Sequence, residues 1–246
     1  MDKTALKYQV SQVQRPLLTC YATVIFITLF FTLLSAATQE RGVTFSVSGL
    51  EFASMIFIFV LALNSCRENL QMFIQNGRSR KTLFFSYLVS VAIISGVIAL
   101  ANLGLTAWGV DSRSLFETAY GGFFPRGRGL AFFLTATLWN FCLHWASALA
   151  GYMIACFYYR AAKGIKIAVS VGLPGLLFFA LPLVDSYLTG GRISVFLVDL
   201  INLALGIGQN GVNNPFYNVV SASLLGAVFA AGSYLLLRGS PVKEVS

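Results

Sequence analysis

The sequence predicts an all-α integral membrane protein with six transmembrane helices. Hydrophobic residues make up 57% of the 246 residues and charged residues only 11%, whereas soluble domains carry about 25% charged residues. The mean hydropathy is +0.76. The apolar residues gather into uncharged runs of about 18 residues or more, the length of a helix that crosses a bilayer. We therefore expect residues 1–246 to form one transmembrane domain.

Long uncharged runs place the individual spans. The first five lie at about residues 17–38, 48–66, 82–108, 130–157 and 166–186. Pro174 and Pro182 should bend the fifth. The last apolar region, residues 200–237, is too long for one span, and turn-forming Gly, Asn and Pro residues interrupt it between Gly206 and Pro215. We therefore expect the sixth span at about residues 217–237.

Lys and Arg are distributed unevenly between the two sides of these spans. Twelve of the 17 fall on one side, in the segment before the first span, in the connections after the second and fourth spans, and after the sixth. Cytoplasmic loops carry the excess of Lys and Arg, so both termini are expected in the cytoplasm. The net charge of +8 reflects this asymmetry. No basic stripe is mixed with exposed aromatic residues, so no nucleic acid is expected as a partner.

Three further segments have patterns of their own. Residues 1–15 are expected to form either a short amphipathic helix on the inner surface or a flexible tail. Residues 193–215 are expected to form a re-entrant segment from the outside or a pair of short helices at the outer surface. In the fourth and sixth spans, small residues recur four apart (Ser147, Gly151, Ala155 and Ala222, Gly226, Ala230). Such faces pack closely on a neighbouring span or on a second subunit.

The motifs of common enzymes and metal sites are absent from the sequence. It contains no G-x-x-x-x-G-K-[ST] phosphate loop, no H-E-x-x-H helix and no G-x-S-x-G elbow. We therefore expect no catalytic residue, no metal and no cofactor bound by this chain. Its four cysteines lack metal-ligand spacing and fall in or beside the spans, where they are expected to be small core residues rather than disulfide partners (Cys20, Cys66, Cys142 and Cys156).

The single histidine, His144, falls near the middle of the fourth span. An ionisable group inside a membrane is a candidate functional residue, and the alternative is a neutral imidazole bonded to a neighbouring helix. No Asp, Glu, Lys or Arg is expected at mid-depth in the six spans. This argues against an ion-coupled carrier, which needs intramembrane carboxylates, so energy for transport would arrive from another subunit.

The most distinctive stretch is RENLQMFIQNGRSRKTLF, residues 67–84, between the second and third spans. It predicts a short polar helix, 67–78, with an apolar stripe of Leu70, Phe73 and Ile74 at helical spacing. The pair Asn76-Gly77 should end this helix, and Ser79 should cap the third span. The alternative is an ordinary basic loop that fixes the topology and touches lipid headgroups.

This layout resembles the permease subunits of bacterial ABC exporters of the type 2 class. The resemblance covers the whole chain, and its most specific part is RENLQMFIQNGRSRKTLF. It implies that helix 67–78 is a coupling helix that docks in a groove of a separate ABC ATPase subunit, which would bind ATP and Mg²⁺. Leu70 and Phe73 would be anchors, Arg67, Glu68 and Arg78 would contact the rim, and Ile74 and Gly77 complete the element.

The resemblance further implies two permease subunits, identical or related, in a bacterial cell membrane. We expect the cargo to be amphipathic or apolar, such as a peptide, a lipid or a drug. Residues that would suit its path are Phe26, Phe30, Phe57, Phe59 and His144, although lipid contact or packing also explains the phenylalanines. Two other functions stay open: an ATP-independent channel or secondary carrier, and a non-transporting membrane protein such as an assembly or immunity factor.

Overall fold

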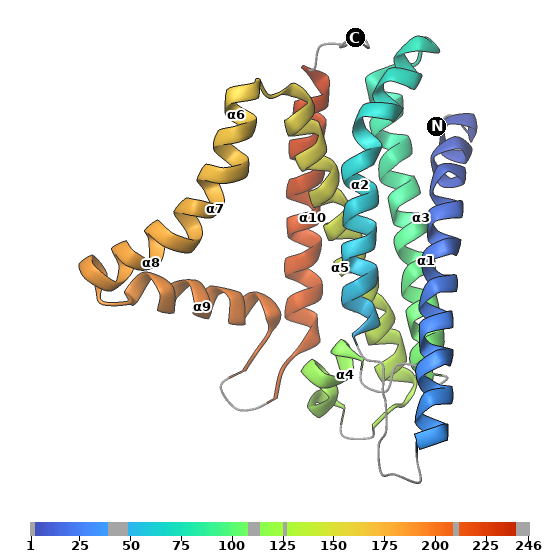
Figure 1. Cartoon of the computed structure of the whole chain (residues 1–246), viewed down its shortest axis with the longest axis vertical. Helices are drawn as coiled ribbons and strands as arrows, with labels where there is room; N and C mark the ends of the chain where they lie inside the picture. The colour runs from blue at the N-terminus through green and yellow to red at the C-terminus, as the bar shows by residue number, and fades with distance from the viewer. Residues whose placement is uncertain (1–2, 39–48, 108–113, 125–126, 209–211, 240–246) are drawn as a thin grey trace.

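The computed structural model describes residues 3–38, 49–107, 114–124, 127–208 and 212–239. Within these ranges the chain forms helices and turns, without strands (Figure 1). Six helical segments are long and apolar enough to cross a membrane. The predicted all-α fold with six candidate spans, as in a multi-pass membrane protein, is therefore confirmed.

Each predicted span overlaps one of these helical segments. Five are single helices: α1 Lys3–Thr38, α2 Leu50–Gln75, α3 Arg80–Ala107, α5 Leu130–Arg160 and α10 Pro215–Arg238. The remaining one is the helical run Lys163–Thr189. In this run α6 Lys163–Ile167, α7 Leu173–Gly175 and α8 Leu181–Val184 alternate with the π-helical turns Ala168–Gly172, Leu176–Ala180 and Asp185–Thr189. Two shorter helices lie between spans: α4 Leu115–Tyr120 and α9 Arg192–Leu205.

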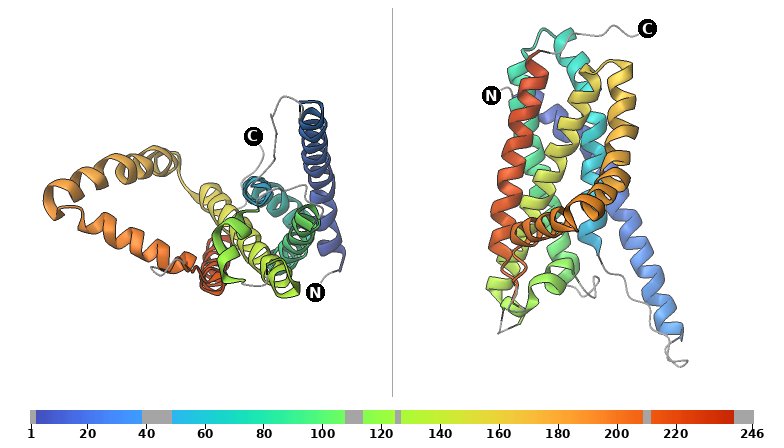
Figure 2. Two further views of the ribbon diagram at one scale, coloured as in Figure 1. Left: turned by 90° about the horizontal axis from the view of Figure 1, so that it is seen from below. Right: turned by 90° about the vertical axis from the view of Figure 1, so that its left-hand side faces the viewer.

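The core of the bundle forms around α5, which packs against α2, α3 and α10 (Figure 2). The faces of small residues make this close packing possible. A side chain at Gly151 would collide with the backbone of Phe59 on α2, and one at Gly226 would collide with the Trp145 ring on α5. Because both glycines face spans of the same chain, the small-residue faces serve packing within the subunit.

Two of the predicted boundaries are wrong, because helices continue where breaks were expected. Residues 3–15 do not form a separate surface helix. They belong to α1, which passes through Pro16 without ending. Likewise, residues 67–75 continue α2, so the polar helix is the last two and a half turns of a span rather than a separate element. The expected end at Asn76-Gly77 is present, with Gly77 in the left-handed conformation at φ +66°.

The run from α6 to α9 leaves the bundle as an arm (Figures 1 and 2). A proline lies in the first turn of both α7 and α8, and a π-helical turn precedes each. Proline removes a backbone donor and crowds the preceding turn, so the predicted bending is confirmed. Segment 193–215 contains one helix among its described residues, α9, which lies across the direction of α10 (Figure 1). The expected pair of short helices is not formed there.

The corner between the arm's two halves depends on Asp185, a residue that the sequence reading did not single out. Its buried carboxylate accepts hydrogen bonds from the backbone amides of Ile193 and Ser194, both at 2.9 Å. It also accepts from the hydroxyls of Ser194 and Thr189. A carboxylate that caps the first amides of a helix stabilises its start, so Asp185 sets where α9 begins.

Replacing Asp185 with alanine is expected to fray the start of α9 while the α1–α2–α3–α5–α10 bundle stays folded. Loss of a cap costs about 1–2 kcal/mol, and the bundle does not contain this corner. Amide hydrogen exchange should therefore accelerate at Ile193 and Ser194 and stay unchanged in α5. Equal acceleration in both places would contradict a local role. Asp199→Ala, on the same helix, is the matched control.

At the end of the bundle where α5 begins, α4 packs against α5. Phe116 and Tyr120 pack on Phe132 and Trp139, and the Glu51 carboxylate accepts from the Leu115 amide at 2.8 Å. The Tyr120 hydroxyl donates to the carbonyl of Leu205 at 2.7 Å. Burial raises the pKa of Tyr120, which keeps this hydroxyl protonated as a donor. This contact joins α4 to the end of α9.

Candidate functional site

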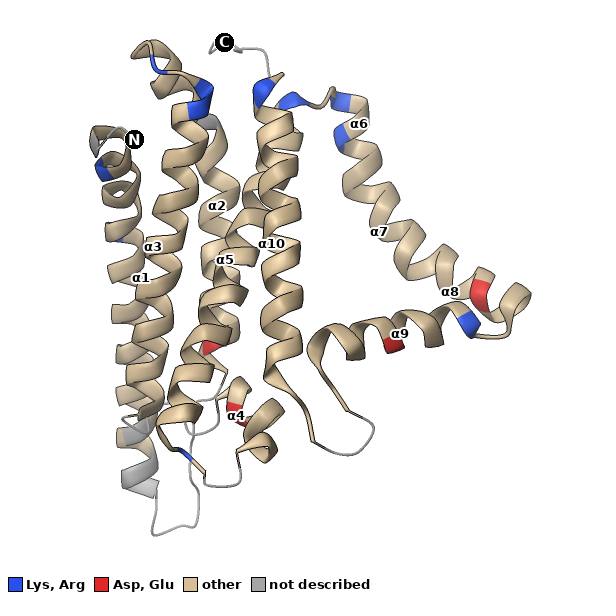
Figure 3. Cartoon of the chain, turned by 180° about the vertical axis from the view of Figure 1, so that it is seen from behind, with Lys and Arg blue, Asp and Glu red and all other residues tan. Residues whose placement is uncertain are grey.

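Positive charge gathers at one end of the molecule. Lys and Arg cluster where α1 begins, where α10 ends and around the α2–α3 and α5–α6 connections (Figure 3). The acidic residues that are coloured red in this view lie in the opposite half (Figure 3). This separation matches the asymmetry predicted from the sequence. The α2–α3 connection therefore lies on the basic end of the bundle, where the sequence analysis expected the contact with an ATPase.

The apolar stripe of this region faces inward. Leu70 is 0% exposed and Phe73 2% exposed, and both belong to the main core. Ile74 is half-buried and packs against the same core. In this arrangement Leu70 and Phe73 are covered by the chain's own core, so the anchor role expected for them stays a prediction.

The exposed part of the connection begins directly after Ile74. Gln75, Asn76, Gly77, Arg78 and Ser79 are all exposed. The Ser79 hydroxyl accepts from the amide of Thr82 at 3.1 Å, as expected of the cap of the third span. The side chains of Arg67 and Glu68 lie outside the described residues, so the rim contacts expected of them have no structural counterpart here.

Arg80 ties this connection to the last span. Its guanidinium donates to the carbonyl oxygens of Leu237 at 3.3 Å and Arg238 at 2.8 Å. The last carbonyls of a helix have no partner within the helix, so Arg80 satisfies two of them at the end of α10. A force applied to the α2–α3 connection would thus reach α2, α3 and α10.

The phenylalanines expected along a substrate path are divided between two settings. Phe26 and Phe30 are 70% and 55% exposed on α1. Phe57 and Phe59 are half-buried on α2, and the backbone and ring of Phe59 lie against Gly151. Phe59 therefore packs between helices, whereas Phe26 and Phe30 face outward from the subunit. His144 lies apart from that outward face, in the core.

His144 belongs to a buried polar network that joins four spans. Its Nε2 lies 2.8 Å from the Ser54 hydroxyl of α2, which in turn accepts from the Asn102 amide of α3 at 3.0 Å. The Asn102 carbonyl oxygen accepts from the Tyr21 hydroxyl of α1 at 3.1 Å. The network ends where His144 Nδ1 meets the backbone carbonyl of Asn140 at 2.5 Å.

For a neutral ring, these contacts indicate which nitrogen of His144 carries the proton. A carbonyl oxygen can only accept, so His144 Nδ1 carries the hydrogen that faces Asn140. A neutral imidazole has one N–H, which leaves Nε2 as the acceptor for Ser54. The Ser54 hydrogen then has two acceptors, His144 Nε2 at 2.8 Å and the Glu51 carbonyl at 3.0 Å. The geometry thus agrees with the alternative in which His144 is a neutral imidazole bonded to a neighbouring helix.

A serine and a histidine at hydrogen-bond distance also form the pair used in nucleophilic catalysis. Here, however, both side chains are buried, with Ser54 7% exposed and His144 1% exposed. No substrate could approach the hydroxyl. The Ser54–His144 pair therefore links α2 and α5 in this structure.

Because the chain has one histidine, its protonation can be read from a single NMR signal. We expect ¹⁵N-histidine labelling of protein purified without a histidine tag to show a neutral ring protonated at Nδ1. In water the other tautomer prevails, so this result would report the Asn140 contact. A ring protonated at Nε2, or one exchanging freely between tautomers, would contradict the network.

Two of the cysteines meet in the core, which their spacing along the chain did not indicate. The sulfur atoms of Cys66 on α2 and Cys156 on α5 are 3.0 Å apart, and both residues are 1% exposed. All four cysteines are free thiols. Within the described residues no group of three or more His, Cys, Asp or Glu side chains could hold a metal ion.

No known family model, curated protein or solved structure matches the chain. Functional assignment therefore depends on the arrangement of its own residues. That arrangement has two prominent features: a basic connection fixed to three spans, and a polar network buried between four.

Proposed function

We propose that the chain is the membrane-spanning subunit of an ATP-driven ABC exporter and works with a separate ATPase subunit. The observation that carries this proposal is the α2–α3 connection. It is short, basic and exposed from Gln75 to Ser79, and Arg80 bonds it to the end of α10. A partner that grips it can therefore move three spans together.

The contact surface is proposed to be Asn76 to Lys81 rather than the buried stripe. In this arrangement the ATPase would contact exposed polar and basic groups. Helix α2 would transmit the resulting movement, because it continues unbroken from Leu50 to Gln75. ATP binding must favour one conformation of the permease through a differential interaction energy. Movement of α2 is the route by which this energy would reach the membrane-spanning helices.

The cargo is proposed to be amphipathic or apolar, and the subunit to work as a pair in a bacterial cell membrane. Phe26 and Phe30 project outward from α1, where a second permease or the cargo would meet them. ATP and Mg²⁺ would bind only to the ATPase subunits. The basic end of the bundle would then face the cytoplasm.

The test is charge reversal at the connection. The double variant Arg78→Glu, Lys81→Glu should weaken binding of the partner ATPase by about 10-fold or more and abolish its stimulation by the permease. Arg192→Glu, an exposed charge at the start of α9, is the matched control and should change neither. The partner would be a protein with a phosphate loop recovered with the wild-type chain in mild detergent.

Three outcomes would overturn this proposal. They are the absence of any phosphate-loop protein in the wild-type complex, unchanged coupling in the double variant, and labelling of position 78 from outside the cell. Phe73→Asp is not a useful substitute, because a carboxylate at this buried position would unfold the bundle.

The buried network favours a second candidate, a carrier that needs no ATPase. An ionisable group in a membrane core often marks a proton or ion path, and His144 is linked through Ser54 and Asn102 to Tyr21. If this function holds, transport in vesicles proceeds without nucleotide and His144→Ala abolishes it. Transport that requires ATP and survives this substitution would exclude it.

A further inference from the structure

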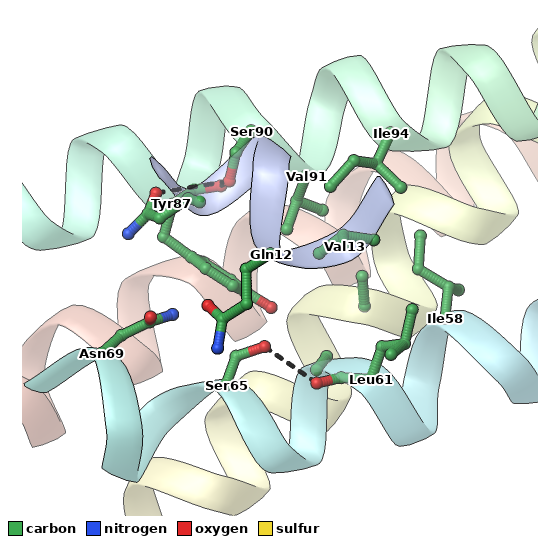
Figure 4. A pocket seen from close by; sticks show the side chains of 13 residues that line it. Gln12, Val13, Ile58, Leu61, Ser65, Asn69, Tyr87, Ser90, Val91 and Ile94 are labelled. Carbon is green, nitrogen blue, oxygen red and sulfur yellow. Dashed lines mark hydrogen bonds between the residues drawn. The ribbon is translucent and has the colours of Figure 1, made fainter. Parts of the chain in front are cut away.

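A polar cavity lies inside the bundle between the N-terminal half of α1 and helices α2, α3 and α5 (Figure 4). Its volume is about 20 Å³. No charged residue lines it. The polar side chains around it are Gln9, Gln12, Ser65, Asn69, Tyr87 and Ser90.

Three of these side chains have a polar atom without a hydrogen-bond partner: Gln9 Nε2, Asn69 Oδ1 and the Tyr87 hydroxyl. The three residues are only 3%, 2% and 4% exposed. A buried polar group without a partner is costly, and a bundle surrounded by lipid offers no bulk water to relieve the cost. Three such atoms around one cavity therefore point to a shared ligand.

The chemistry of the three atoms selects that ligand. Gln9 Nε2 carries N–H groups and is a donor. Its Oε1 lies 3.4 Å from the Ser90 hydroxyl, whose hydrogen is shared with the Tyr87 carbonyl at 2.8 Å. Asn69 Oδ1 is an acceptor, and a tyrosine hydroxyl can be either. The donor disfavours a metal cation, and the absence of a positive side chain disfavours an anion. A cavity needs about 10–15 Å³ to hold one water molecule, and a buried water typically makes about three hydrogen bonds.

We propose that this cavity binds one ordered water molecule that joins α1, α2 and α3. The water accepts from Gln9, donates to Asn69 and bonds the hydroxyl of Tyr87. It thereby connects the N-terminal half of α1, whose polar side chain would otherwise be unpaired, to the two helices that carry the basic connection. This inference is independent of the proposed function.

A double-mutant cycle tests the shared ligand. Gln9→Met and Asn69→Leu keep the side-chain size and remove the polar atoms. Each is expected to lower the melting temperature in detergent by about 3–6 °C, because the groups that remain lose their bridge. The double variant should lose less than the sum, because the water is lost only once. Gln14→Met and Asn64→Leu, exposed positions on the same helices, should leave the melting temperature nearly unchanged.

An empty cavity predicts a different result for the same variants. Without a water, Asn69→Leu removes an unpaired polar atom, and Gln9→Met loses only the long contact with Ser90, whose hydroxyl still bonds the Tyr87 carbonyl at 2.8 Å. Each variant should then be about as stable as the wild type or more stable, and the two effects should add. A second measurement uses the unaltered protein in lipid nanodiscs. Water-edited NMR should show magnetisation transfer from a slowly exchanging water to the side-chain amides of Gln9 and Asn69. Absence of transfer to both amides would overturn the proposal even if the variants fail to fold.

Discussion

Replacing Gly151 with alanine is expected to destabilise the protein by about 2–4 kcal/mol. A Cβ atom at this position would lie 2.5 Å from the carbonyl oxygen of Phe59 and 3.1 Å from the Cβ of Ala62. The first of these neighbours is backbone, so a rotamer change cannot relieve the collision. Helix α2 would have to move away from α5 as a unit.

The effect is large because other α2–α5 contacts need the same separation. The Ser147 hydroxyl donates to the carbonyl of Met55 at 3.1 Å, and Ser54 meets His144 at 2.8 Å. Further along, Cys66 meets Cys156. A displacement of α2 by less than 1 Å would lengthen each of these contacts, so one added methyl group disturbs the whole interface.

Gly96→Ala is the matched control, because a Cβ atom at this glycine in α3 has no neighbour within 4 Å. Alanine is favoured over glycine in a helix by roughly 0.5–1 kcal/mol, so this variant should be as stable as the wild type or slightly more so. Thermal unfolding in detergent, followed by loss of the monodisperse peak, measures both variants. Equal stability of Gly151→Ala and Gly96→Ala would show that α2 and α5 do not approach this closely.

Local features of the fold could be predicted from the sequence because they depend on neighbouring residues. Uncharged length defines the spans, Asn76-Gly77 ends α2, and Ser79 caps α3. Proline chemistry predicts the bending of the run that contains Pro174 and Pro182. Each of these follows from residues within one or two turns of the feature itself.

What covers an apolar stripe could not be predicted in the same way. The spacing of Leu70, Phe73 and Ile74 shows that the helix has an apolar face, but a partner subunit or the chain's own core can cover such a face. The structure covers it with the core that includes Ala5 near the start of α1. That was missed because residues 1–15 were expected to form a separate surface helix or a flexible tail.

The polar network was also beyond sequence reasoning. Ser54 and His144 are 90 residues apart, and Asn102 lies 48 residues from Ser54 and 81 from Tyr21. Serine, asparagine and tyrosine are common in transmembrane helices and carry no local sign of a partner. His144 was singled out because an ionisable group inside a span needs an explanation.

Ser54→Ala is expected to cost about 2–4 kcal/mol, since one hydroxyl serves two other buried groups. Without it, His144 Nε2 loses its donor and the Asn102 amide loses its acceptor. Ser233→Ala on α10 is the matched control. Its hydroxyl is equally buried but bonds only to the carbonyl of Phe229 in its own helix, and that carbonyl keeps its backbone partner. The control should therefore cost less than about 1 kcal/mol.

The second step of this prediction separates an unpaired polar group from simple loss of packing. If the cost of Ser54→Ala comes from the unpaired imidazole, then His144→Leu in the same chain should add less than it costs alone, by about 1 kcal/mol or more. If the cost comes from a cavity, the two substitutions should add or worsen each other. The histidine NMR signal offers an independent check, because Ser54→Ala should shift Nε2 while leaving the proton at Nδ1 in place, held by the Asn140 carbonyl.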